Sequence, residues 1–331
     1  MKAREVFSLA LNDALTQAGE FAGESSELTL DERVHGFRRA VRRARGLLRV
    51  ARAGIDDETR GRLNEMLRSA NASTSALRDA AVLFDALEAL SDDPEMEPAK
   101  ERARASLEAQ LAISASSRSP EHVLASAAEG VATVRLVIES VKLQELGAGD
   151  VAKAIGELWE KAADARTDAI FSGDRDDFHV WRKRTKEIRA GVQTLVAAGA
   201  PLAGLLHDLK LAARAQGEIT DVFVLRDALQ GVDFSGVEDS AALLWEAIEE
   251  QMTLGMRLVI AEFALPFDVS AGTVRRKVRR ALKDGLSRIA NPADAEDHAE
   301  RDDDDEDDVP LALDHVTQDA SKSRGDEGDD D

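Results

Sequence analysis

Seven arginines and one histidine, with no acidic residue, lie in the stretch RVHGFRRAVRRARGLLRV at residues 33–50. Arginines at this density can bind oxyanions, because each planar guanidinium donates two parallel hydrogen bonds to phosphate or carboxylate oxygens. The chain also contains 32 Arg against 11 Lys, which favours this bidentate chemistry over simple point charges. The stretch therefore predicts a site for a multiply charged anion, and a solvated cationic helix face is the alternative.

In a helix, the cations of this stretch separate from its apolar residues. Phe37, Val41 and Leu48 lie on one side. The opposite side is a cationic stripe of His35, Arg38, Arg39, Arg42, Arg45 and Arg49. Like charges four residues apart repel, so a stripe without acids costs stability unless an anion compensates it. We therefore favour an anion site, to which a histidinium would add charge increasingly below pH about 6.5.

The same pattern returns 144 residues later, where HVWRKRTKEIR at 179–189 matches HGFRRAVRRAR at 35–45. The second stripe consists of His179, Arg182, Lys183, Lys186 and Arg189. A further match, of RDAAVLFDAL at 78–87 with TDVFVLRDAL at 220–229, has an offset of 142. Two matches at nearly one offset predict a duplicated helical unit with pseudo-two-fold symmetry between its halves.

Other charged residues accompany the two stripes. The duplication pairs Arg68 with Lys210 and also pairs Asp79 with Asp221. We expect the two aspartates to pack or cap helices, and they could also hold Arg or Lys side chains in place. A third basic segment, at 274–288, contributes Arg276, Arg279, Arg280 and Lys283, for which a solvated helix is the alternative.

The sequence shows few residues arranged for metal binding or covalent catalysis. Each repeat supplies one His at the matched position, and the chain has no Cys, so a metal site would need ligands from distant parts. Neither a nucleophile with its base nor a pair of carboxylates is evident in the repeated segments. We therefore expect no metal, no cofactor and no enzymatic activity.

Helices must position the two stripes. The composition is rich in helix-forming Ala, Leu, Glu and Arg, and turn signals split the chain into roughly eight to ten segments with helical periodicity. Thr29 and Glu32 predict a capping box at the head of the arginine-rich helix. We predict an all-α fold of duplicated antiparallel helical bundles, with two four-helix-bundle-like halves at residues 1–150 and 151–290.

The negative charge of the chain is concentrated at its end. Residues 291–331 carry 18 acidic and three basic residues, which is −15 of the net charge of −21. We predict a disordered acidic tail there. Adaptation to high salt or a simple gain in solubility would also explain its many acidic residues. No window approaches 18 uncharged apolar residues, so we expect no membrane span, and the lack of Cys fits a reducing cytoplasm.

The duplicated pattern H-x-aromatic-R-[RK]-x-x-[RK], followed by an aspartate 44 and 42 residues later, resembles the CHAD family of α-helical domains with characteristic histidines. The resemblance spans roughly residues 28–290. It implies two four-helix bundles whose basic helices face each other across a groove that binds inorganic polyphosphate. It also implies ligand contacts from both stripes, with Arg68, Lys210 and the 275–283 cluster as flanking contributors.

The sequence departs from this pattern at several positions. Glu187 stands where the first copy has Arg43, and the 154–170 segment is acidic where the family tends to be basic. Gly217 precedes the second aspartate segment, whereas the first copy lacks this glycine. The alternating ExExK strand of a fused triphosphatase domain is not visible, which argues against hydrolysis of triphosphates.

We therefore expect a cytoplasmic, non-catalytic domain that binds inorganic polyphosphate, including polyphosphate in granules. The alternative is a protein-interaction or granule-associated scaffold whose basic groove receives acidic segments, among them residues 291–331 of this chain. Nucleic acid is disfavoured because each stripe has one aromatic residue, placed on its apolar side, and so lacks a stacking platform. The sequence leaves the oligomeric state open.

Overall fold

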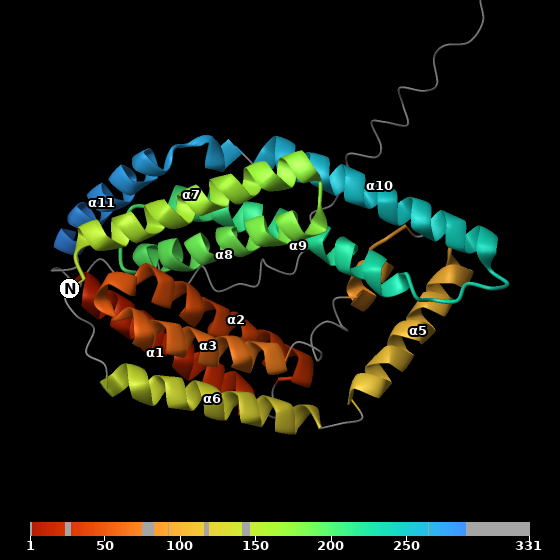
Figure 1. Cartoon of the computed structure of the whole chain (residues 1–331), viewed down its shortest axis with the longest axis horizontal. Helices are drawn as coiled ribbons and strands as arrows, with labels where there is room; N and C mark the ends of the chain where they lie inside the picture. Colours follow the sequence, from red (N-terminus) through yellow and green to blue (C-terminus); the bar gives the residue numbers. More distant parts are fainter. Residues whose placement is uncertain are drawn as a thin grey trace, which may run out of the picture. The chain divides into compact units, whose positions relative to one another are not determined.

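The structure is a computed structural model that describes residues 2–23, 28–74, 83–91, 93–115, 119–140, 146–263 and 265–288. The described residues contain helices and no strand, which confirms the all-α prediction (Figure 1). These helices all belong to one compact unit at residues 1–293. The predicted acidic tail at 291–331 lies outside the described residues.

Four helices of the first half pack as a bundle. They are α1 (Ala3–Ala22), α2 (Leu30–Val50), α3 (Asp57–Ser73) and α6 (Pro120–Ser140). The Thr29 and Glu32 capping box is confirmed: Oγ1 of Thr29 accepts a hydrogen bond from the Glu32 N–H, and Glu32 Oε2 accepts one from the Thr29 N–H at 2.7 Å. This box fixes where α2 begins.

Helices of the second half form a group. They are α7 (Ala148–Ser172), α8 (Arg175–Ala197), α9 (Ala203–Leu229), α10 (Glu238–Phe263) and α11 (Ala271–Arg288). In this group α8 packs between α7 and α9, with α11 on α7 and α10 on α9. Short 3₁₀ turns, η1 (Arg52–Gly54) and η2 (Leu265–Asp268), follow α2 and α10. Trp181 of α8 is fully buried beside Phe178 and Phe267, with ring centroids 6.0 and 5.9 Å away. This aromatic core holds α8 with its apolar side inward.

Helix α5 (Glu97–Ala115) leaves the first bundle and packs on α10 of the second half (Figure 1). The Ala99 N–H donates a hydrogen bond to Ser240 Oγ at 3.0 Å within this contact. The contact of α5 with α10 thus joins the predicted segments at 1–150 and 151–290, in addition to the chain connection between them. The duplication itself stays a prediction.

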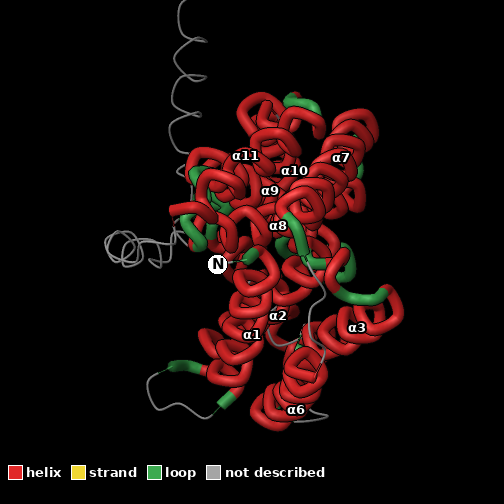
Figure 2. The backbone as a smooth tube through the Cα atoms, turned by 90° about the vertical axis from the view of Figure 1, so that its left-hand side faces the viewer, coloured by secondary structure: helices red, strands yellow, loops and turns green. Residues whose placement is uncertain are grey.

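The helices that carry the two stripes join the bundles directly. A Cβ added to Gly46 of α2 would lie 2.7 Å from Ala190 Cβ of α8, and one added to Gly191 would lie 2.7 Å from Val50 Cγ2. Glycine at these two positions therefore lets the backbones of α2 and α8 approach more closely than any larger residue would permit. Figure 2 shows α2 next to α8, with α7, α9, α10 and α11 on the other side of α8.

Candidate functional site

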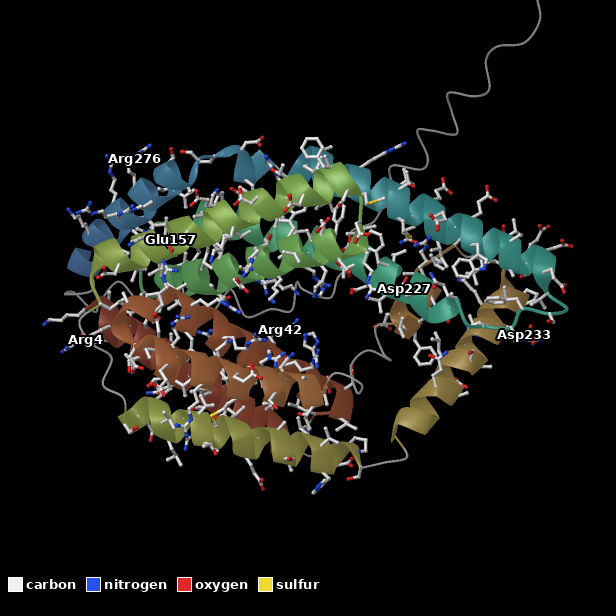
Figure 3. All side chains as sticks on the ribbon, viewed as in Figure 1. Arg4, Arg42, Glu157, Asp227, Asp233 and Arg276 are labelled. Atoms are coloured by element: carbon white, nitrogen blue, oxygen red, sulfur yellow. The ribbon has the colours of Figure 1, made fainter. Side chains whose placement is uncertain are left out.

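The two cationic stripes meet between α2 and α8. The pKa of Lys186 on α8 lies well below its ordinary value of 10.5, first because burial removes water from the amine. The positive charges of Arg182, Arg42 and Arg189 lower this pKa further, while Asp221 of α9 opposes them. Figure 3 shows Arg42 on the side of α2 that faces α8 and α9. Cations from two helices therefore share one region, in which like charges are held close together.

We call this set of side chains the α2–α8 cluster. It consists of Arg42, Arg45, Arg49, Arg182, Lys183, Lys186 and Arg189. Burial is the largest cause that lowers the pKa of Arg45, Arg49 and Lys183. Nearby cations lower each pKa further, and the carboxylate of Glu187 opposes them. A region of this kind favours a bound anion, because the anion relieves both the lost hydration and the mutual repulsion.

One acid stands inside the cluster. Glu187 is 5% exposed, and its Oε1 lies 3.0 Å from Arg49 Nη1 in ionic contact without hydrogen-bond geometry. Its Oε2 accepts a hydrogen bond from Arg184 Nη1 at 3.0 Å. Sequence comparison of the repeats marked Glu187 as a departure at the position of Arg43. Its role as the buried partner of Arg49 was not predicted, because the repeat does not reveal which helix faces it.

Helix α3 holds two arginines of the first stripe. Arg38 Nη1 donates a hydrogen bond to the Asn71 carbonyl at 2.8 Å, and Arg45 Nε donates one to Asn64 Oδ1 at 3.1 Å. Arg42 bends back over its own helix, where Nε donates to the Arg38 carbonyl at 3.2 Å. Arg38 and Arg45 are predicted ligand contacts, and both side chains also pack against α3. The sequence did not indicate this second role.

Helix α9 holds Arg182 of the second stripe. Arg182 Nη1 lies 3.4 Å from Asp221 Oδ1, so Asp221 does hold a basic side chain, as was considered from the sequence. A Cβ added to Gly217 would lie 3.0 Å from Arg182 Nη2, so the glycine leaves room for this guanidinium. Asp79, the predicted counterpart of Asp221, lies outside the described residues.

The two matched histidines lie toward the N-terminal ends of the stripes. His35 is half-buried, and His179 is on the exposed side of α8. The pKa of His179 is lowered from 6.5, first by partial desolvation of the ring and then by Arg182 and Lys183. His179 therefore gains its proton at a more acid pH than the sequence alone suggested.

The remaining predicted residues lie around or apart from the cluster. Arg39 is exposed on α2, and Lys210 is half-buried on α9. Arg68 is exposed on α3 and pairs with Glu65, whose Oε1 lies 2.7 Å from Arg68 Nη2. Arg276, Arg279, Arg280 and Lys283 are exposed on α11. Because α11 packs on α7, and α8 lies between α11 and α2, the structure does not bring these four cations to the cluster (Figures 1 and 2).

The described residues contain no group of three or more His, Cys, Asp or Glu residues that could hold a metal ion. None of their helices combines the length and apolar character that crossing a membrane requires.

Comparison with known proteins identifies the fold. The model of a family described as CHAD domain matches residues 14–230, which run from the middle of α1 to the end of α9 and include both cationic stripes. The chain therefore belongs to the CHAD domain family. No curated protein matches the chain.

Proposed function

We propose that this CHAD domain binds inorganic polyphosphate between α2 and α8 and does so without catalysis. Membership of the CHAD family supports a polyphosphate-related function. The observation that carries the proposal is the close packing of α2 on α8, where Arg49 Nη1 lies 3.0 Å from Glu187 Oε1. This packing brings Arg42 and Lys186, two cations of different helices, close enough for their charges to act on each other. A linear chain of phosphates presents negative charge along its whole length, so one molecule can neutralise cations from both helices.

Affinity in this proposal comes from charge-assisted hydrogen bonds and from the release of counterions. Arginine pairs with phosphate oxygens through two parallel N–H groups, whereas Lys183 and Lys186 act as compact positive charges. Each phosphate that is neutralised releases condensed counterions, so the affinity falls steeply as salt concentration rises. Helices α3 and α9 hold Arg38, Arg45 and Arg182 in place, which reduces the entropy lost on binding.

Charge reversal in the cluster tests the proposal. The double variant Arg42→Glu with Lys186→Glu should lose retention of long-chain polyphosphate at moderate salt, while its circular dichroism remains that of a folded helical protein. The matched control is Arg135→Glu with Arg257→Glu, which changes the same net charge at exposed positions on α6 and α10. Equal retention by the two double variants would contradict a site between α2 and α8.

The alternative function, a scaffold for acidic protein segments, is separated by competition. A poly-glutamate peptide carries its charges on flexible carboxylates spaced along a peptide backbone, whereas polyphosphate has a denser array of oxyanions. We expect polyphosphate to displace the peptide at a much lower concentration of charge than the peptide needs to displace polyphosphate. The reverse order would favour the scaffold.

A further inference from the structure

Helix α11 carries a second concentration of positive charge. Its apolar side, including Val274, Val278 and Leu282, is buried. Its other side exposes Arg275, Arg276, Lys277, Arg279, Arg280 and Lys283. The helix is therefore amphipathic in an extreme form, with a buried aliphatic side and an exposed side made almost entirely of cations.

The start of α11 is firmly held. Trp159 Nε1 of α7 donates a hydrogen bond to the Val269 carbonyl at 2.8 Å, just before the helix begins. A Cβ added to Gly156 would lie 3.3 Å from Arg275 Cβ, so α7 and α11 are in close backbone contact. The cations of α11 thus stand on a rigid base, which is a requirement for pre-organised binding.

No carboxylate neutralises the central part of this surface in the residues that the structure describes. Arg276 Nη2 donates a hydrogen bond to Thr273 Oγ1 at 2.9 Å, within the same helix. Among the side chains that the structure describes, which on this helix end at Lys283, no Asp or Glu oxygen lies within 4.0 Å of Arg276, Lys277, Arg279 or Arg280. This contrasts with the α2–α8 cluster, where Glu187 and Asp221 compensate part of the charge.

The same surface includes an open depression beside the connection between α8 and α9. Pro201, Thr273, Arg276, Lys277, Arg280 and Ala281 line it. Three cations and one hydroxyl group therefore border a single hollow. Arg276 and Arg280 are one turn apart on the helix, about 6 Å along its axis, so both can reach one bound anion.

We propose that α11 forms a second binding surface for polyphosphate, separate from the α2–α8 cluster. The two surfaces share no residue. Helix α11 packs on α7, and α8 lies between α11 and α2 (Figures 1 and 2). From the sequence, the α11 cations were expected to flank the same groove as the two stripes. Because α11 packs on α7, away from α2, these cations form a separate surface. This proposal does not depend on the function proposed for the α2–α8 cluster.

The ligand of α11 is a chain of phosphate oxyanions. Guanidinium groups at the mouth of the depression fit tetrahedral oxyanions through bidentate hydrogen bonds. Each described α11 residue that lines the depression is aliphatic, hydroxyl-bearing or cationic, so the hollow lacks an aromatic surface on which nucleobases would stack.

Counting bound ligand tests this proposal on the full chain. Equilibrium dialysis at low salt measures the moles of tripolyphosphate bound per mole of protein at saturation. We expect two for the unmodified chain and one for Arg276→Glu with Arg280→Glu. Arg42→Glu with Lys186→Glu should also bind one, and the combination of all four substitutions should bind none. Arg135→Glu with Arg257→Glu is the control and should bind two.

The outcomes separate this inference from the proposed function. If the α11 double variant binds as much as the unmodified chain, the second surface does not exist. If only the α11 variant loses ligand, the second surface stands and the α2–α8 site fails. A neutral version, Arg276→Gln with Arg280→Gln, should also lose one ligand, and its circular dichroism shows whether folding is intact. Binding of single-stranded RNA at α11 in preference to polyphosphate would overturn the assignment of the ligand.

Discussion

Arg49 of α2 and Glu187 of α8 form an ion pair across the contact between the two bundles, with 3.0 Å between Nη1 and Oε1. The carboxylate is 5% exposed, and it also accepts a hydrogen bond from Arg184. An acid at this position offsets part of the repulsion that two facing cationic helices would otherwise create. The sequence departure at residue 187 thus places a negative charge where the two stripes come together.

Replacing this acid should weaken the fold and strengthen anion binding. Glu187→Gln leaves Arg49 and Arg184 without their partner, and we expect a loss of about 1–3 kcal/mol in the free energy of unfolding. The same change makes the cluster more cationic, so polyphosphate should bind more tightly at low salt. Urea denaturation and a polyphosphate titration measure the two effects.

The control for this variant is Asp57→Asn, which removes an exposed partner of Arg60 on α3. Such surface pairs contribute at most about 1 kcal/mol, so both readouts should change little. A Glu187→Gln protein as stable as the unmodified chain would show that the pair does not support the contact between the bundles.

Lys186 should cost stability in the absence of ligand. Its pKa in the folded chain is well below 10.5, so the unfolded chain binds the proton more tightly. The cost grows as pH falls from 10.5 toward the folded pKa and is constant below it. Lys186→Met should therefore raise the free energy of unfolding at neutral pH by about 1 kcal/mol while weakening polyphosphate binding.

Denaturation across a pH series checks this sign. The gain from Lys186→Met should shrink as pH rises toward 10.5 and vanish above it, where the lysine is neutral in both states. Lys153→Met, at an exposed position on α7, should change stability by no more than about 0.5 kcal/mol. A loss of stability in Lys186→Met at neutral pH would refute the repulsion described for the cluster.

His179 should contribute to anion binding only at acid pH. Because its pKa lies below 6.5, the ring is mainly neutral near pH 7 and gains a proton as pH falls. His179→Gln should alter the affinity for polyphosphate by less than about two-fold near pH 7.5 and by more at pH about 5.5. His122→Gln, at an exposed position on α6, is the control. A large loss at pH about 7.5 would mean that the neutral ring contacts the ligand.

The close approach of α2 to α8 should be sensitive to a single methyl group. In Gly46→Ala the new Cβ would lie 2.7 Å from that of Ala190, so the helices must separate. We expect a destabilisation of about 1–3 kcal/mol and weaker binding of polyphosphate. Chemical denaturation measures the first effect and titration the second.

Two further variants separate crowding from other effects of this change. Gly61→Ala on α3 meets no atom within 4 Å and should stabilise its helix by about 0.5–1 kcal/mol. Gly46→Ala combined with Ala190→Gly removes the clash, so most of the lost stability and affinity should return. No recovery in the double variant would place the cause of the loss elsewhere.

Much of the fold could be predicted from the sequence, because its determinants are local. The capping box of Thr29 and Glu32 is a local pattern, and it is present at the start of α2. The same holds for the turn signals at 171–177 and 197–204, where α7, α8 and α9 end or begin. The end of α3 at Ser73 was not predicted, because the sequence there keeps its helical periodicity and lacks Gly and Pro.

The site could be predicted only as far as one helix determines it. The helical wheel gives the direction of each cation relative to its own axis, and it placed Arg43 outside the stripe, where Asp13 of α1 pairs with it at 3.1 Å. It does not give the neighbouring helix. For that reason the hydrogen bonds of Arg38 and Arg45 to α3, and the position of α11 on α7, came only from the structure.

The most direct test of this account is a crystal structure of the chain with bound polyphosphate. We predict phosphate oxygens within hydrogen-bond distance of both the Arg42 guanidinium and the Lys186 amine, so that one polyphosphate chain bridges α2 and α8. An ordered polyphosphate that contacts neither Arg42 nor Lys186, with the space between them filled by water, would contradict it.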